Sequence, residues 1–307
     1  MDVNMLPVPP VPKVLDATEV DEVQRGIITY NTGDRGTSYT GLVEWTLGPG
    51  FPAMPRNVIS AQERLPQPPL DYSEWDTGSL REEEAKTLPI YATTEEYIDP
   101  LMNQPIPGLV YRWLWNEPPS TLRDIFRLVP KPPGQERRRL CEYIATQVRS
   151  LHVHFALRHP GLRLDSFVFV GRTLSDLNSG HFFILDWART PVNDIYRHPE
   201  WTTKMPLLWV YNVWSLLMVL CDIAEWSPYS PPSRRSKVAS GMLKLKEDRR
   251  EKVRSKRWKG EKTGRVFDWA FKVIDKSIEE AAGWEDEHFE IKKFYDKLCW
   301  ELRPEAD

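Results

Sequence analysis

The side chains best suited to chemistry gather in one short stretch, residues 151–170. It contains several histidines followed by a cation, an acid and a hydroxyl: His152, His154, His159, Arg163, Asp165 and Ser166. Such groups could bind a metal, activate a nucleophile or position a phosphoryl group. A metal site needs three or four convergent ligands, and residues two apart on a helix do not share a face. We therefore predict structural roles for His152 and His154. Neither Ser166 nor Ser215 has a His and acid partner that would make it a nucleophile.

The elements that must position these groups are a long helix and two short strands. Apolar residues at Leu140, Ile144, Val148, Leu151 and Phe155 make one face of a helix over Gln135–Phe155. After this helix, the stretch 151–170 predicts a tight loop that leads into a strand at Phe167–Val170. A second strand is predicted at His181–Leu185, after a polar connection.

Four further motifs follow in order. They are Ile-Leu-Asp-Trp-Ala-Arg at 184–189, Tyr-Arg-His-Pro-Glu at 196–200, Val-Tyr-Asn-Val-Trp-Ser-Leu-Leu at 210–217 and Glu-Trp-Ser-Pro-Tyr at 225–229. From His159 to Asp186 is 27 residues, from Asp186 to Glu200 is 14, and from Glu200 to Asn212 is 12. Each motif alone has little specificity, whereas the ordered set has more.

This set resembles the protein-kinase catalytic loop, magnesium motif, activation-segment end and central helix. Over residues 108–229 the chain is similar to the kinase-like domains of filamentous fungi that accompany prion-inhibition and propagation domains. The resemblance implies an α+β, two-lobed kinase-like fold. Its parts would be a Pro-rich flexible tail (1–22), a degenerate β-containing N-lobe (23–111), a hinge (112–119) and a mainly helical C-lobe (120–303).

The resemblance also assigns roles to residues. His159, Arg163 and Asp165 would be remnants of the catalytic loop, with Gly161 at the position of the catalytic Asp and Ser166 at that of the metal-binding Asn. Asp186 would be the surviving magnesium ligand, and Glu200 would anchor the activation segment. Asn212, on the core helix with Trp214, would stand where an Asp pins the loop. Thr46, after the strand-like run Leu42–Trp45, would replace the lysine that pairs the phosphates.

A kinase needs the catalytic Asp to orient the substrate hydroxyl and accept its proton, and glycine can do neither. We therefore expect a catalytically impaired kinase-like domain, a pseudokinase, acting as a scaffold or regulator for other proteins. No cofactor is expected. One alternative is an atypical kinase that keeps Mg-ATP through Asp186. Another is nucleic-acid binding through the basic run Lys252–Lys259, for which a solvated surface or a nuclear-import signal is the competing interpretation.

Composition sets broad limits on these expectations. The net charge of −3 predicts no global attraction to nucleic acid or to anionic membranes. No apolar run is long enough to span a bilayer comfortably. The three cysteines, Cys141, Cys221 and Cys299, are widely spaced in apolar contexts and are predicted to be buried thiols of an intracellular protein. A cytoplasmic or nuclear location is therefore expected.

The remaining elements follow from periodicity and turn residues. A hairpin is predicted from Arg25–Tyr30 and Ser38–Thr46, and a buried strand at Gly108–Trp115. A helix at Thr121–Leu128 would be capped by Ser120. A helix at Leu207–Ala224, apolar nearly all round, should be buried. Two amphipathic helices are predicted at Arg265–Glu280 and Asp286–Leu302.

Overall fold

The computed structural model describes a large part of the chain in segments. These are residues 24–32, 37–45, 87–88, 90–98, 105–113, 115, 119–159, 161–171, 182–187, 196–198, 208–228, 261–280 and 287–304. They form two compact units. The first contains the described residues between 24 and 122 and those between 165 and 187. The second contains those between 123 and 164 and those from 196 onward.

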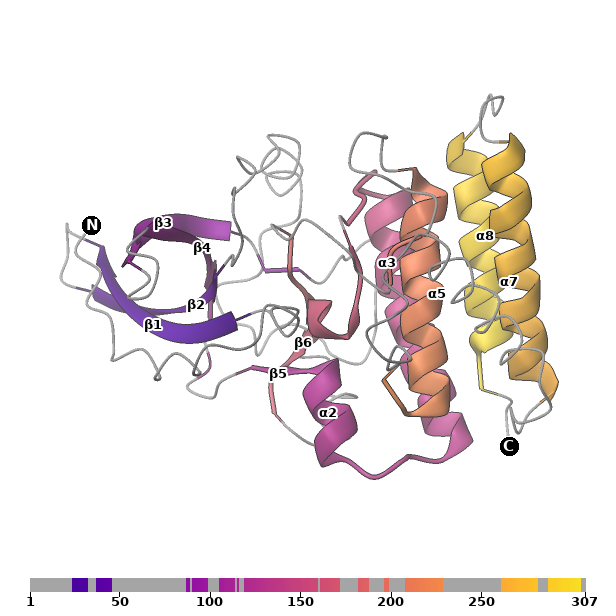
Figure 1. Cartoon of the computed structure of the whole chain (residues 1–307), viewed down its shortest axis with the longest axis horizontal. Helices are drawn as coiled ribbons and strands as arrows, with labels where there is room; N and C mark the ends of the chain where they lie inside the picture. The colour runs from indigo at the N-terminus through magenta and orange to yellow at the C-terminus, as the bar shows by residue number, and fades with distance from the viewer. Residues whose placement is uncertain are drawn as a thin grey trace, which may run out of the picture. The chain divides into compact units, whose positions relative to one another are not determined.

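The first unit is built around a four-stranded antiparallel sheet in the order β1-β2-β4-β3 (Figure 1). The strands are β1 (Gln24–Thr32), β2 (Thr37–Trp45), β3 (Ile90–Ile98) and β4 (Pro105–Arg112). β2 and β4 are central, and their apolar residues Leu42, Val43, Leu109 and Val110 are buried. Because residues on both faces are buried, β2 is enclosed where it carries Glu44.

A second, three-stranded antiparallel sheet has the order β5-β6-β7. Its strands are β5 (Ser120–Thr121), β6 (Phe167–Phe169) and β7 (Phe182–Ile184), and the short helix η2 (Leu164–Ser166) leads directly into β6. Aromatic rings fill this region: Phe167 stacks on Phe182 with ring centroids 5.6 Å apart, and Trp113 meets Phe183 edge-on. This packing fixes the backbone that leads from β7 to Asp186.

The second unit is helical. It contains α2 (Leu122–Leu128), α3 (Gly134–Val153), α5 (Trp209–Glu225), α7 (Glu261–Glu280) and α8 (Glu287–Leu302). α3 packs against α5 and α8, and α7 packs against α5 and α8 (Figure 1). Every residue of α5 except Glu225 is buried. It ends at Trp226, whose left-handed φ of 54° is held by an indole hydrogen bond to Val129 O and by a tilted ring contact with Phe126.

Several predicted elements are confirmed: the hairpin strands, the strand before residue 115, the strands around 167–169 and 182–184, and the long helices. The predicted apolar stripe of α3 is buried from Leu140 to Leu151, and the three cysteines are free and buried. The cap at Ser120 is wrong, because Ser120 and Thr121 pair with β6 and the helix begins only at Leu122. The strand β3 was not predicted, because its run Thr93–Glu96 is polar.

At the coarse level the molecule is an α+β protein with small antiparallel sheets and a larger helical part. No helix within the described segments has the length and apolar character needed to cross a membrane. The predicted tail 1–22, Thr46, Glu200 and the basic run Lys252–Lys259 lie outside the described residues.

Candidate functional site

A buried ion pair joins β1 and β2 in the first unit. Arg25 and Glu44 are directly opposite each other on β1 and β2, so their side chains share one face of the sheet. The Arg25 Nε–Glu44 Oε2 and Nη2–Oε2 distances are both 2.9 Å, and the two side chains are 6% and 2% exposed. Two buried charges are costly unless each neutralises the other and their remaining polar atoms are bonded. Glu44 neutralises Arg25, but Arg25 Nη1 is buried without a hydrogen-bond partner in the described part of the chain.

Glu44 accepts further hydrogen bonds that join three segments of the chain. Tyr111, diagonally across from it on β4, donates its hydroxyl to Oε1 at 3.3 Å. The backbone N–H of Asp186 donates to Oε2 at 3.2 Å. Burial and the neighbouring Asp186 carboxylate raise the pKa of Glu44, although Arg25 opposes them. Burial lowers the pKa of Arg25, but the carboxylates of Glu44, Asp186 and Asp165 outweigh it, and the net shift is upward.

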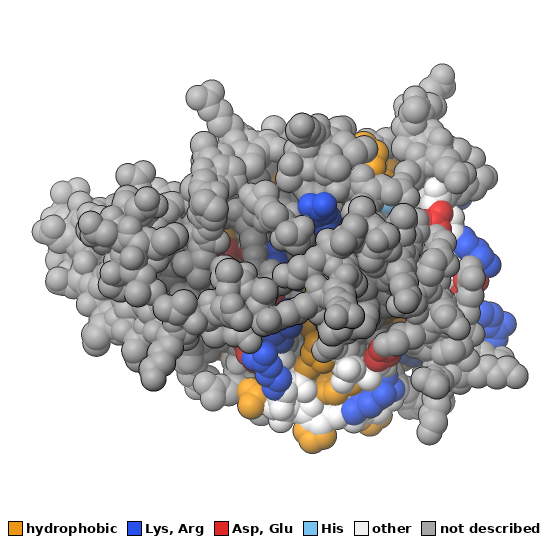
Figure 2. Space-filling model, viewed as in Figure 1, with side chains coloured by type: hydrophobic (Ala, Val, Ile, Leu, Met, Phe, Trp, Pro, Cys, Tyr) orange, Lys and Arg blue, Asp and Glu red, His pale blue; other side chains and the backbone are white. Residues whose placement is uncertain are grey.

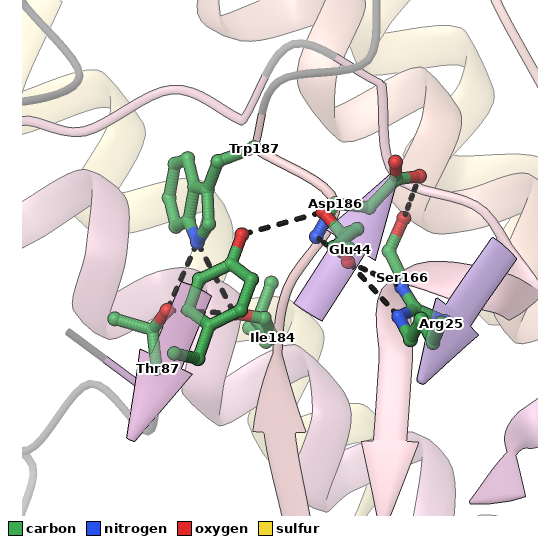
Figure 3. Close-up of polar contacts among 8 residues, drawn as sticks. Arg25, Glu44, Thr87, Ser166, Ile184, Asp186 and Trp187 are labelled. Carbon is green, nitrogen blue, oxygen red and sulfur yellow. Dashed lines mark hydrogen bonds and ion pairs between the residues drawn. The ribbon is translucent and has the colours of Figure 1, made fainter. Parts of the chain in front are cut away.

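Asp186 itself follows β7 and is 1% exposed. Its carboxylate Oδ2 accepts a hydrogen bond from Ser166 Oγ at 3.3 Å, and Leu185 N donates to Ser166 O at 2.9 Å, so two contacts tie this segment to the start of β6. Figure 3 draws Asp186 between Glu44 and Ser166. Its φ of 71° is left-handed, a region that Asp tolerates better than most side chains. Strained backbone of this kind persists only where the surroundings hold it.

Trp187, the residue after Asp186, is also buried and hydrogen-bonded. The Trp187 indole N–H contacts both Thr87 Oγ1 at 2.9 Å and Ile184 O at 3.2 Å, and Thr87 donates to Ile184 O at 2.7 Å (Figure 3). Trp187 is 2% exposed. The large ring is thereby fixed by hydrogen bonds on its one polar atom, and the turn at Asp186 is held from both ends.

These groups are a poor fit to a magnesium–nucleotide site. Mg²⁺ takes oxygen ligands that can give it near-octahedral geometry, usually carboxylates together with substrate phosphates. Here Asp186 and Glu44 are engaged with Ser166, Arg25 and backbone, and a guanidinium already supplies the positive charge. Within the described segments no three His, Cys, Asp or Glu side chains converge as metal ligands.

A second polar network lies inside the helical unit. Asn212 on α5 donates its Nδ2–H to the carbonyl of His159 at 2.5 Å, which fixes the orientation of the amide. Its Oδ1 must therefore accept, and it accepts from Nε2 of His152. The other ring nitrogen, Nδ1, is left to accept the hydroxyl of Tyr295 on α8 at 3.0 Å. His152 is thus a neutral ring with its proton on Nε2, and burial lowers its pKa to about 4.

The loop after α3 is the target of this network. Its His159 is fully buried, and the backbone N–H of Gly161 donates to His159 Nδ1 at 3.1 Å. The chain Tyr295–His152–Asn212–His159 therefore connects α8, α3 and α5 to the loop. Asn212, predicted to stand where an Asp pins the loop, contacts the loop backbone as a donor, through its Nδ2–H to the His159 carbonyl.

The segment 196–198, the described part of the Tyr-Arg-His-Pro-Glu motif, is anchored to α5, in part through Asp222, which sequence reasoning did not single out. Tyr196 donates its hydroxyl to Asp222 Oδ2 at 2.6 Å, and Asp222 is fully buried on α5. His198 packs between the rings of Tyr211 and Trp214, both about 5.0 Å away between centroids. The predicted anchor, Glu200, lies outside the described residues.

The predicted site residues thus divide between two networks. Ser166 and Asp186 meet in the first unit, where Asp165 is also buried. His159, Gly161 and Asn212 meet in the second, where Arg163 and Trp214 are buried. Sequence reasoning missed Arg25, Glu44, Thr87 and Tyr111. An isolated acid inside an apolar strand was the available signal for Glu44, since a buried carboxylate requires a partner.

The cysteines add no reactive group to either network. Burial raises the pKa of Cys141 to about 12 and that of Cys299 to about 11, so neither is a thiolate near neutral pH.

In comparisons with known proteins, no family model matches the chain and the search of curated proteins gives no significant match.

Proposed function

We propose that this chain is a catalytically impaired protein-kinase-like domain that acts through contacts with other proteins, as a scaffold or regulator. The proposal of a kinase-like domain rests on the ordered motifs from His159 to Trp214. The proposal that catalysis is impaired rests on the burial and the hydrogen bonds of the residues in these motifs. Fungal origin and a cytoplasmic or nuclear place of action belong to the same proposal.

The enclosure of Asp186 is the observation that carries the proposal. A kinase uses this carboxylate to hold magnesium against the phosphates of ATP, and it uses a strand lysine to pair them. In this chain Asp186 is 1% exposed, and its carboxylate is hydrogen-bonded to Ser166. The neighbouring strand presents Glu44, an acid, and the cation beside it is already paired. Negative phosphates would meet two buried carboxylates there.

Two further features support the proposal. Gly161 has no side chain to act as a base where the resemblance requires one. The loop that carries it is nevertheless held firmly, because Asn212 bonds the His159 carbonyl and Gly161 bonds the His159 ring. A loop kept in place without its reactive groups favours a structural use of the fold.

A phosphotransfer assay on restored variants tests this. The wild-type chain and the double variant Gly161→Asp/Ser166→Asn are incubated with magnesium and γ-labelled ATP, with a general protein acceptor. Gly161 has no positive φ, so its backbone accepts a side chain. We expect no labelling by either protein. The double variant restores the base, but it leaves Asp186 buried beside the Arg25–Glu44 pair.

Asp186→Asn in each background is the matched control. Labelling by the wild type that disappears in Asp186→Asn would overturn the proposal in favour of an atypical kinase. Labelling by the double variant alone would show that nucleotide does reach the site, and would contradict the enclosure argument.

A further inference from the structure

We draw no further inference here: the strongest candidate, the surface patch of basic and apolar side chains over α2 and the start of α3 around the exposed Leu128 (Figure 2), is built from cations that already have contacts within the chain, such as Arg127 with Asp124 and Arg137 with the Pro132 carbonyl, and nothing in the structure shows what covers it.

Discussion

The hydrogen-bond partners of His152 and its burial determine the protonation state of its ring. Its Nε2 donates to Asn212, its Nδ1 accepts from Tyr295, and the ring is 4% exposed. Of the two neutral tautomers only the one with its proton on Nε2 satisfies both nitrogens, and burial opposes a second proton. Buried histidines of this kind couple stability to pH even when they take no part in catalysis.

We predict that acid destabilises the chain through His152. Its pKa is lowered from 6.5 to about 4 in the folded chain. Between these values the unfolded chain binds a proton that the folded chain excludes, so stability falls as pH falls. The loss from this residue should be about 3 kcal/mol across that window. Urea unfolding of wild type and His152→Gln at several pH values measures it.

The variant His152→Gln keeps a donor and an acceptor but does not titrate, so its pH dependence should be shallower. His154→Gln, an exposed neighbour, serves as the control and should follow the wild type. The comparison of variants matters because Glu44, whose pKa is raised, contributes a slope of the opposite sign. Equal slopes for wild type and His152→Gln would show that His152 titrates normally.

Removing the hydroxyl of Tyr295 should also be measurable. Tyr295→Phe leaves His152 Nδ1 without a donor in a buried site, so the free energy of unfolding should fall by about 1–3 kcal/mol. Tyr143→Phe on α3 is a matched control, since no hydrogen bond of its hydroxyl is part of this network. A Tyr295→Phe protein as stable as wild type would show that water replaces the bond.

At the scale of elements, the β1–β2 pair and β4 together create the acidic cluster. Only the antiparallel register that sets Arg25 opposite Glu44 gives both charges a partner, and a shift by one residue would send them to opposite faces. Arg25 and Glu44 can therefore be buried together only when β1 and β2 pair in this register. The ion pair also links the first sheet to Asp186 through the backbone N–H.

A double-mutant cycle on Arg25 and Glu44 tests this link. Arg25→Met alone leaves Glu44 buried beside Asp186 without its cation, and should cost about 3–5 kcal/mol of stability. Arg25→Met/Glu44→Leu removes both charges and should be more stable than Arg25→Met. Chemical denaturation of the wild type, Arg25→Met, Glu44→Leu and the double variant measures the coupling. A double variant whose loss equals the sum of the single losses would mean that the two residues do not interact.

Element prediction from the sequence succeeded where apolar periodicity was strong. The apolar stripes of α3 and α8 predict helices with one buried face, and the all-round apolar character of α5 predicts a fully buried helix. Element prediction failed for β3, whose middle residues Thr93–Glu96 carry no alternating signal. It could not find the Arg25–Glu44 pair, since hairpin limits were uncertain by one residue and one residue reverses the faces.

At the scale of the whole molecule, the loop residues that the sequence singled out serve structural networks. Asn212 and His159 hold the loop, while Ser166 and Asp186 hold the turn after β7. The sequence identified these residues as candidates. It could not predict their hydrogen bonds, because the partners Glu44, Tyr295 and Asp222 lie in distant elements and belong to no recognisable motif. Under the proposed function, a domain whose candidate reactive groups satisfy one another is suited to present stable surfaces to other proteins.

Thermal unfolding of the purified chain with ATP, with and without magnesium, is the most direct test of this account. Binding at a ligand concentration 100-fold above the dissociation constant would add about 2.7 kcal/mol, enough to raise the midpoint by several degrees. With Asp186 enclosed, we predict the same midpoint in buffer, with ATP and with Mg-ATP. A magnesium-dependent rise that Asp186→Asn removes would contradict the account and identify a working nucleotide site.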